Sequence, residues 1–278
     1  MSGLWRVVRN RRGLLGGVVV AAMLAAGILA PAVAPYSYST QSLLQRLKPP
    51  TAAHWLGTDG FGRDILTRVI WGARVSLEIG FLATGLAIVG GTAVGGAAGY
   101  FGGPVDTGIM RVADVFMSVP ALFLILVVVA LFGASLLNTA LVVGLVTWPP
   151  VARIVRGECL TLRARDFVEA ARALGASHGR ILARHVLVNA VPAIIVQGTL
   201  LLGQTILIES GLSYLGLGVQ PPTPSWGNMV VEGRQFLGSA WWVSTFPGLA
   251  IFATVLGFNL FGDGLRDALD PALRSGSR

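Results

Sequence analysis

Few polar side chains in this 278-residue sequence could do chemistry, and most of them interrupt long apolar runs. Ser210 and Ser213 lie among glycines, but no histidine lies near them in the sequence to act as a general base, so neither is expected to be a nucleophile. The sequence contains neither a Gly-x-Ser-x-Gly hydrolase turn nor a Gly-x-x-x-x-Gly-Lys-Ser/Thr phosphate loop. One cysteine, and three histidines without paired carboxylates, argue against a metal site. We therefore expect no catalytic residue, no metal and no cofactor on this chain.

A second group of polar residues lies near the end of a long apolar run. Gln197 and Gln204 are seven residues apart, or two helical turns, so they lie on one face of a helix. Glu209, Ser213 and Tyr214 follow them, and an ionisable group at membrane depth is by default a functional candidate. These five residues could line a translocation path or gate. They could equally form hydrogen bonds between packed helices, and the sequence leaves both alternatives open.

The most polar segment inside the apolar sequence is a predicted helix–turn–helix within residues 159–189. Residues 166–175 are helix-forming residues followed by a glycine that is placed to end the helix in a left-handed turn, and Ser177 can cap a second helix. The apolar side chains at helical spacing are predicted to share one face: Phe167, Val168, Ala171 and Leu174. So short a helix cannot bury that face alone, and we expect it to dock on a partner. A solvated loop joining two membrane helices is the alternative.

Several stretches of the sequence resemble one family of transport proteins. Glu169-Ala170-Ala171, followed after three residues by Gly175, resembles the EAA loop of ABC importer permeases. Arg184-His185 with the aliphatic residues that follow is similar to the dipeptide and oligopeptide branch of that family. Further stretches resemble the same branch: residues 54–64, 72–77, 209–227 and 259–271. On these residues the sequence is identified as a C-type permease subunit of that branch.

The resemblance implies an all-α, type I ABC importer permease fold whose EAA loop forms a coupling helix that docks in a cleft of an ATPase. It implies a heterodimer with a homologous permease, two cytoplasmic subunits that bind ATP and Mg²⁺, and an extracytoplasmic substrate-binding protein. The implied cargo is a di- or oligopeptide; nickel or another small solute is an alternative, and an ion-coupled secondary transporter is a further one. The implied coupling residues are Asp166, Phe167, Val168, Glu169, Ala170, Ala171, Arg172, Leu174 and Gly175.

The composition independently indicates an integral membrane protein. Hydrophobic residues make up 54% of the chain and charged residues only 12%, which is too apolar for a soluble domain. The net charge of +8 could suggest nucleic acid, but the basic residues lie at the ends of apolar runs and in one loop. We therefore expect this chain to lie in a lipid bilayer and not to bind nucleic acid.

Apolar runs predict six transmembrane helices, near residues 14–34, 75–100, 116–132, 139–154, 190–208 and 245–261. The first run could be a cleaved signal peptide, because Ala32-Val33-Ala34 resembles a peptidase site, but its length favours a retained helix. The predicted organisation is a cytoplasmic N-terminus (1–13), a first transmembrane helix (14–34), an extracytoplasmic loop (35–74), a core (75–265) with the coupling loop (159–189), and a cytoplasmic tail (266–278). Most basic residues then lie inside, as the positive-inside rule requires, in a bacterial or archaeal cytoplasmic membrane.

Local patterns add four structural expectations. Gly91, Gly95 and Gly99 recur every four residues, which predicts a face for close helix packing. In the outer loop, Asp59, Arg63 and Asp64 are expected to pair locally. The glycines and prolines of residues 209–227 predict an irregular re-entrant or gate-forming stretch. A short cytoplasmic turn is expected at Asp106, Arg111 and Asp114.

Overall fold

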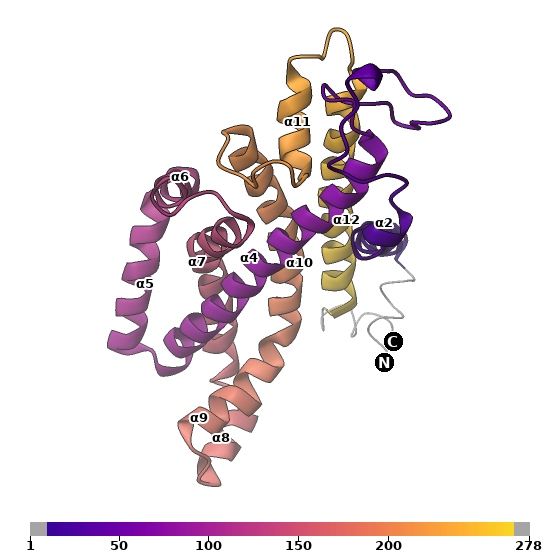
Figure 1. Ribbon diagram of the computed structural model, residues 1–278. Coiled ribbons are helices and arrows are strands. Elements are labelled where there is room, and N and C mark those ends of the chain that lie inside the picture. Colours follow the sequence, from indigo (N-terminus) through magenta and orange to yellow (C-terminus); the bar gives the residue numbers. More distant parts are fainter. Residues whose placement is uncertain (1–9, 270–278) are drawn as a thin grey trace.

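The computed structural model describes residues 10–269, in which every named regular element is a helix (Figure 1). The elements are α2 (Arg11–Ile28), α3 (Ala30–Val33), the 3₁₀ turn η1 (Leu43–Gln45), α4 (Ile65–Phe101), α5 (Gly103–Ser118), α6 (Ala121–Phe132), α7 (Leu136–Leu162), α8 (Asp166–Ala173), α9 (His178–Ile181), the π-helical turn η2 (Leu182–Val186), α10 (Leu187–Tyr214), α11 (Trp226–Arg234) and α12 (Trp242–Leu269). Five helical runs in this part of the chain are long and apolar enough to cross a membrane, and the bent pair α5–α6 provides a possible sixth. The predicted all-α membrane fold is confirmed.

Of the six predicted spans, the third differs most from the observed structure. Helices α5 and α6 meet at a bend of 83°, and Pro120 is the N-cap of α6. Proline has no N–H to continue a helix and drives the residue before it, Val119, into extended backbone. At 12 residues α6 is about 18 Å long, well short of the roughly 30 Å hydrocarbon layer. A single straight span over 116–132 was therefore the wrong expectation.

The charged residues before this bend also differ from the prediction. Asp106, Arg111 and Asp114 lie on α5 rather than in a turn. Asp106 accepts hydrogen bonds from the Arg156 guanidinium at 2.5 and 2.6 Å, and Asp114 pairs with Arg153 at 2.5 Å. These ion pairs connect α5 to α7, so the charges hold two helices together.

Several helices are longer than the apolar runs that predicted them. α4 begins at Ile65 rather than near residue 75, because the side chain of Asp64 caps the helix by accepting from the N–H of Thr67 at 2.7 Å. α7 continues through Pro149 to Leu162. α10 continues to Tyr214, so residues 209–214 are helical and the irregular segment is shorter than the predicted 209–227. Hydropathy marks the lipid-exposed length of a helix, whereas hydrogen bonds and caps decide where it ends.

The predicted glycine face is confirmed between α4 and α7. A Cβ on Gly95 would lie 2.2 Å from the carbonyl oxygen of Ala152, and one on Gly91 would lie 2.6 Å from the Cβ of Val151. At Gly99 an added Cβ would lie 2.6 Å from the Arg156 carbonyl. Only glycine permits two backbones to approach this closely, and such packing replaces the hydrophobic attraction that helices lack in lipid.

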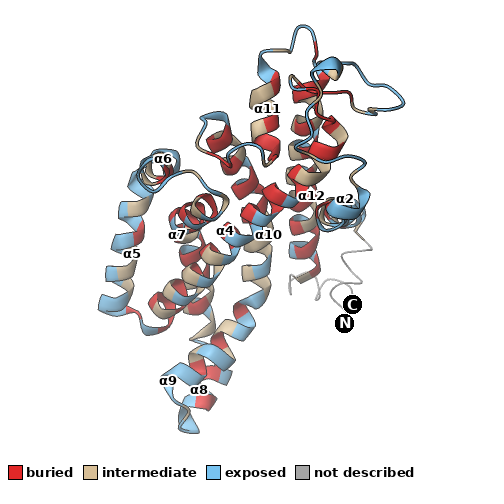
Figure 2. Cartoon of the chain, in the orientation of Figure 1, coloured by how far each residue is buried: buried red, intermediate tan, exposed pale blue. Residues whose placement is uncertain are grey.

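The distribution of buried residues shows which faces are covered within this chain. Figure 2 shows buried positions on the facing sides of α4, α7, α10 and α12, and largely exposed positions on α5 and α6. The exposed positions include large apolar side chains such as Leu131, Phe132 and Phe252, which are 74, 72 and 63% exposed. Lipid or another membrane-embedded protein must cover such surfaces.

Candidate coupling surface and translocation path

Helix α8 has one face attached to the body of this chain. Val168 is fully buried and Ala171 nearly so, in an apolar cluster with Val155, Cys159 and Ile181. These two short side chains fix α8 on the end of α7 and on the turn that leads into α10. Because they are covered within the chain, Val168 and Ala171 do not present a surface to a partner.

The apolar sector of α8 consists of Phe167, Val168, Ala171 and Leu174, and its other edge is exposed. Phe167 is 40% exposed and Leu174 is 88% exposed. At about 100° per residue, these two lie at one edge of the sector and Val168 lies at the other. The prediction that all four apolar residues would face outward together was therefore wrong. Asp166, Glu169 and Arg172 are also exposed, so α8 presents a mixed apolar and charged surface at the tip of the molecule (Figure 1).

Gly175 ends α8 as the sequence predicts. Its φ is +78°, and it donates its N–H to the Arg172 carbonyl at 3.0 Å while Ala176 donates to the Ala171 carbonyl at 3.1 Å. This pair of bonds is the Schellman motif, which uses a left-handed residue to satisfy the last carbonyls of a helix. Ser177 occupies the N-cap position of α9, but its side chain makes no capping hydrogen bond.

The chain after α8 is mechanically continuous with a membrane helix. α9, η2 and α10 form one helical run from His178 to Tyr214, 37 residues long. A displacement of α8 would therefore be transmitted to a helical segment about 55 Å long. That helical run contains the π-helical turn Leu182–Val186, a form that commonly marks functional positions in helices, and Pro192 lies inside α10.

Glu209 and Ser213 lie in a buried polar cluster where three helices meet. Glu209 is fully buried and accepts hydrogen bonds from Ser213 Oγ at 2.8 Å and Ser76 Oγ at 3.4 Å. Ser76 Oγ also accepts from the backbone N–H of Trp226 at 3.3 Å, and Ser225 lies 3.4 Å from Ser213. The cluster joins α4, α10 and the start of α11. For Glu209 and Ser213 this geometry favours the second alternative, hydrogen bonds between packed helices.

The other candidates for a path or gate are separated from this cluster. Gln204 is exposed, whereas the half-buried Gln197 lines a pocket of about 450 Å³ between α7, α10 and α12, together with Glu158 and Arg266. Tyr214 is 47% exposed and accepts a hydrogen bond from Arg234 at 2.6 Å. The five predicted residues thus lie in four separate places and do not form one group.

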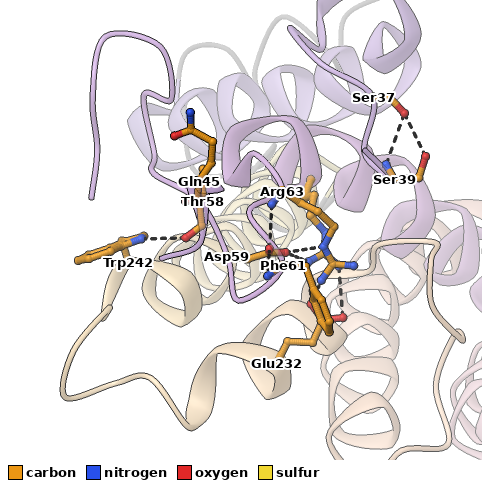
Figure 3. A network of polar contacts seen from close by, with 10 residues as sticks. Ser37, Ser39, Gln45, Thr58, Asp59, Phe61, Arg63, Glu232 and Trp242 are labelled. Carbon is orange, nitrogen blue, oxygen red and sulfur yellow. Dashed lines mark hydrogen bonds and ion pairs between the residues drawn. The ribbon is translucent and has the colours of Figure 1, made fainter. Parts of the chain in front are cut away.

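A charged cluster in the predicted outer loop, at the end of the helices opposite α8, was only partly foreseen (Figure 1). Asp59 pairs with Arg63 at 2.6 Å, as predicted (Figure 3). It also pairs with Arg68 at 2.5 Å. Both arginines also contact Glu232 of α11 at 2.6 Å. Asp64 pairs with His54 at 2.9 Å. Arg68 was missed although it lies nine residues from Asp59, whereas Glu232 was missed because it lies more than 160 residues from both arginines.

Within residues 10–269 no group of three or more histidine, cysteine, aspartate or glutamate side chains could hold a metal ion. The polar residues described so far are instead paired with one another or exposed at the surface. What the geometry offers is a set of long apolar helices, an exposed helical tip, and buried contacts that join elements distant in sequence.

Comparison with known proteins agrees with this architecture. The family model described as binding-protein-dependent transport system inner membrane component matches residues 88–275, and the N-terminal transmembrane domain of oligopeptide transport permease C matches residues 3–50. The chain is 43% identical to the dipeptide transport system permease protein DppC of Alkalihalophilus pseudofirmus, over 96% of this chain and 88% of the relative. It is 41% identical to the glutathione transport system permease protein GsiD of Pectobacterium atrosepticum, over 97 and 90%.

These matches and the helical fold define a multi-pass permease subunit of the inner membrane. The chain belongs to the permease family of binding-protein-dependent ABC importers, in its dipeptide and oligopeptide branch, as its sequence motifs indicated. A third relative in that branch is the probable D,D-dipeptide transport system permease protein DdpC of Escherichia coli, which is 39% identical over 96% of this chain.

Proposed function

We propose that this chain forms half of the translocation pore of an ATP-driven importer of dipeptides or short oligopeptides. The support for this cargo is that relatives aligned along nearly the whole chain carry names of dipeptide, D,D-dipeptide and glutathione permeases. The other half of the pore is a homologous permease. The exposed apolar side chains of α5 and α6 provide surface that such a partner or lipid would cover.

In this proposal the chain is not catalytic. Two cytoplasmic subunits bind ATP and Mg²⁺ and carry out hydrolysis, and an extracytoplasmic binding protein delivers the substrate. Both termini and α8 face the cytoplasm of a bacterial or archaeal cell. The chain contributes the path through the membrane and converts the motion of the ATPases into a change of access.

The single observation that carries the coupling role is the two-sided geometry of α8. Val168 and Ala171 anchor the helix to this chain, whereas Phe167 and Leu174 remain free to enter an apolar cleft on an ATPase. Asp166, Glu169, Ala170 and Arg172 surround that apolar contact, where charged groups orient a docked helix through hydrogen bonds or ion pairs. Gly175 sets the direction in which the chain returns to α10.

Two substitutions test this coupling surface in the assembled importer. Glu169→Lys reverses a charge beside the docking face, and Gly175→Val places a β-branched residue at φ +78°, a conformation that costs non-glycine residues roughly 1–2 kcal/mol or more. We expect each to lower peptide uptake by at least tenfold while the amount of protein in the membrane is unchanged. Uptake and ATPase activity in proteoliposomes are the measurements.

Gly175→Asn is the matched control, because asparagine tolerates left-handed backbone and an added Cβ meets no atom within 4 Å. It should keep most of the uptake. If Glu169→Lys and Gly175→Val both transported peptide normally, the coupling role of α8 would be wrong.

The cargo is tested by competition. Uptake of a labelled dipeptide should be reduced by an excess of other short peptides and unaffected by nickel chelates. Inhibition by nickel chelates alone would favour the metal-importing alternative. Uptake driven by an ion gradient without ATP would favour a secondary transporter and contradict the proposal.

A further inference from the structure

A pocket of about 390 Å³ opens where α4 and α7 end beside the α8–α9 turn. It lies next to the coupling surface but on the side that faces the membrane helices. The residues that line it are Tyr100, Phe101, Arg163, Ala164, Arg172 and His178. Two arginines and a histidine line it from different segments, and none of the described lining residues is acidic.

The pocket is ordered by contacts at its floor. Arg163 donates from Nη1 to the Tyr100 carbonyl at 3.2 Å, which leaves most of its five N–H donors for a ligand. The Tyr100 hydroxyl lies 3.0 Å from Nδ1 of His178, and this hydrogen bond holds the imidazole against α4. An added Cβ on Gly102 would lie 2.8 Å from Arg163 Nη1, so the absence of a side chain there lets the guanidinium enter.

The position of the pocket follows from the helices that form it. The span formed by α4 ends at Phe101, and the span formed by α7 ends at Leu162. Tyr100 and Phe101 lie at the end of α4, and Arg163 and Ala164 follow the end of α7, so the pocket lies where two helices that are long and apolar enough to cross a membrane come to an end. Phe101 is 52% exposed and stacks edge-on against Tyr100 with ring centroids 5.1 Å apart. Tyrosine is enriched where transmembrane helices meet the lipid head groups.

We propose that this pocket binds the phosphate of an anionic phospholipid whose chains lie in the adjoining leaflet. Clustered arginines at the end of transmembrane helices attract anionic head groups, and a guanidinium donates to a phosphate through two parallel N–H groups. Bound there, the phosphate connects the end of α4 to Arg172 on α8, so the lipid composition would influence the position of the coupling helix. The inference goes beyond the proposed import function and does not depend on the cargo or on the ATPase.

The test measures lipid binding to the purified full-length chain. Native mass spectrometry in a zwitterionic detergent counts phosphatidylglycerol and phosphatidylcholine retained by each variant. We expect the wild type to prefer phosphatidylglycerol. Arg163→Gln should lower its affinity for phosphatidylglycerol about fivefold, because each basic residue near a charged membrane surface contributes on the order of 1 kcal/mol. Arg180→Gln is the matched control and should bind as the wild type does, because Arg180 is exposed on α9 but does not line the pocket.

Two further variants separate lost binding from lost folding. Arg163→Lys keeps the charge and should bind phosphatidylglycerol better than Arg163→Gln. His178→Gln removes the imidazole that lines the pocket without touching the Arg163–Tyr100 contact and should also weaken binding. Each variant should show a wild-type melting temperature in lipid-free detergent, and if Arg163→Gln fails this control the comparison rests on His178→Gln.

Three results would overturn the proposal. One is equal retention of phosphatidylglycerol and phosphatidylcholine by the wild type. Another is a loss of phosphatidylglycerol in Arg180→Gln as large as in the pocket variants. The third concerns a soluble source of phosphate: stabilisation of the chain by inorganic phosphate or glycerol 3-phosphate, but not by phosphatidylglycerol, would assign the pocket to a soluble anion.

Discussion

Asp59 is the residue on which the outer charged cluster depends. Its side chain is almost fully buried and accepts from Arg63 Nε, Arg68 Nη1 and the backbone N–H groups of Phe61 and Arg63. Both arginines are themselves buried, so their charges need carboxylates nearby. Glu232 supplies the second carboxylate, and α11 is thereby held against the outer loop (Figure 3).

Removing the charge of Asp59 should therefore destabilise the protein strongly. We expect Asp59→Asn to lower the free energy of unfolding by roughly 3–5 kcal/mol, because two buried guanidiniums would be left to share one carboxylate. Thermal unfolding in detergent, followed by circular dichroism, is the measurement.

Asp114→Asn is the control for that change. Asp114 also pairs with an arginine, but the two side chains are 50 and 46% exposed, and such pairs contribute about 0–1 kcal/mol. Equal stability losses in Asp59→Asn and Asp114→Asn would show that burial of the cluster is not what makes it strong.

At the scale of elements, glycines let the backbones of α4 and α7 approach closely. The two helices approach until a Cβ on Gly95 would overlap the Ala152 backbone. A similar contact joins α2 to α12, where a Cβ on Gly16 would lie 2.4 Å from the backbone nitrogen of Phe261. These contacts fix the relative positions of four membrane helices.

Adding one methyl group on either side of α4 tests this packing. Gly95→Ala should separate α4 from α7 and destabilise the protein by roughly 1–3 kcal/mol, the usual effect of overpacking. Gly90→Ala should be neutral or stabilising by up to about 1 kcal/mol, because no atom lies within 4 Å of its added Cβ and alanine favours helix. The melting temperatures of the two variants decide the matter; a loss in Gly90→Ala as large as that in Gly95→Ala would contradict close packing as the cause.

At the scale of the whole molecule, the outer cluster and α8 lie at opposite ends of the helices (Figure 1). One end carries the Asp59–Glu232 cluster, and the other carries the exposed Phe167 and Leu174. The proposed function requires that the first end face the exterior and the second face the cytoplasm, where ATP is available.

Labelling of engineered cysteines tests that orientation. The native Cys159 is fully buried and should remain unlabelled, so the wild type serves as the background. In intact cells a membrane-impermeant maleimide should label Ser39→Cys in the outer loop but not Leu174→Cys. In inverted vesicles the labelling should reverse, and bound ATPase subunits should protect Leu174→Cys. Labelling of Leu174→Cys from outside the cell would contradict the proposed orientation.

The sequence by itself determined the membrane fold, the end of α8 at Gly175, the glycine face of α4 and the Asp59–Arg63 pair. Each of these depends on interactions between residues close in the chain: hydropathy along a run, a left-handed glycine, four-residue spacing, or two charges a turn apart. The family resemblance also followed from local motifs, which tertiary contacts do not alter.

Only the tertiary structure decided which edge of α8 remains exposed and that Glu232 completes the outer cluster. Periodicity places Phe167 and Val168 on neighbouring parts of a helix but cannot say which of them another segment covers. Glu209 and Gln204 both lie on α10, five residues apart. Glu209 is buried in a contact with Ser76 of α4, whereas Gln204 is exposed. Burial depends on elements that are distant in sequence, and so it is settled only when those elements pack.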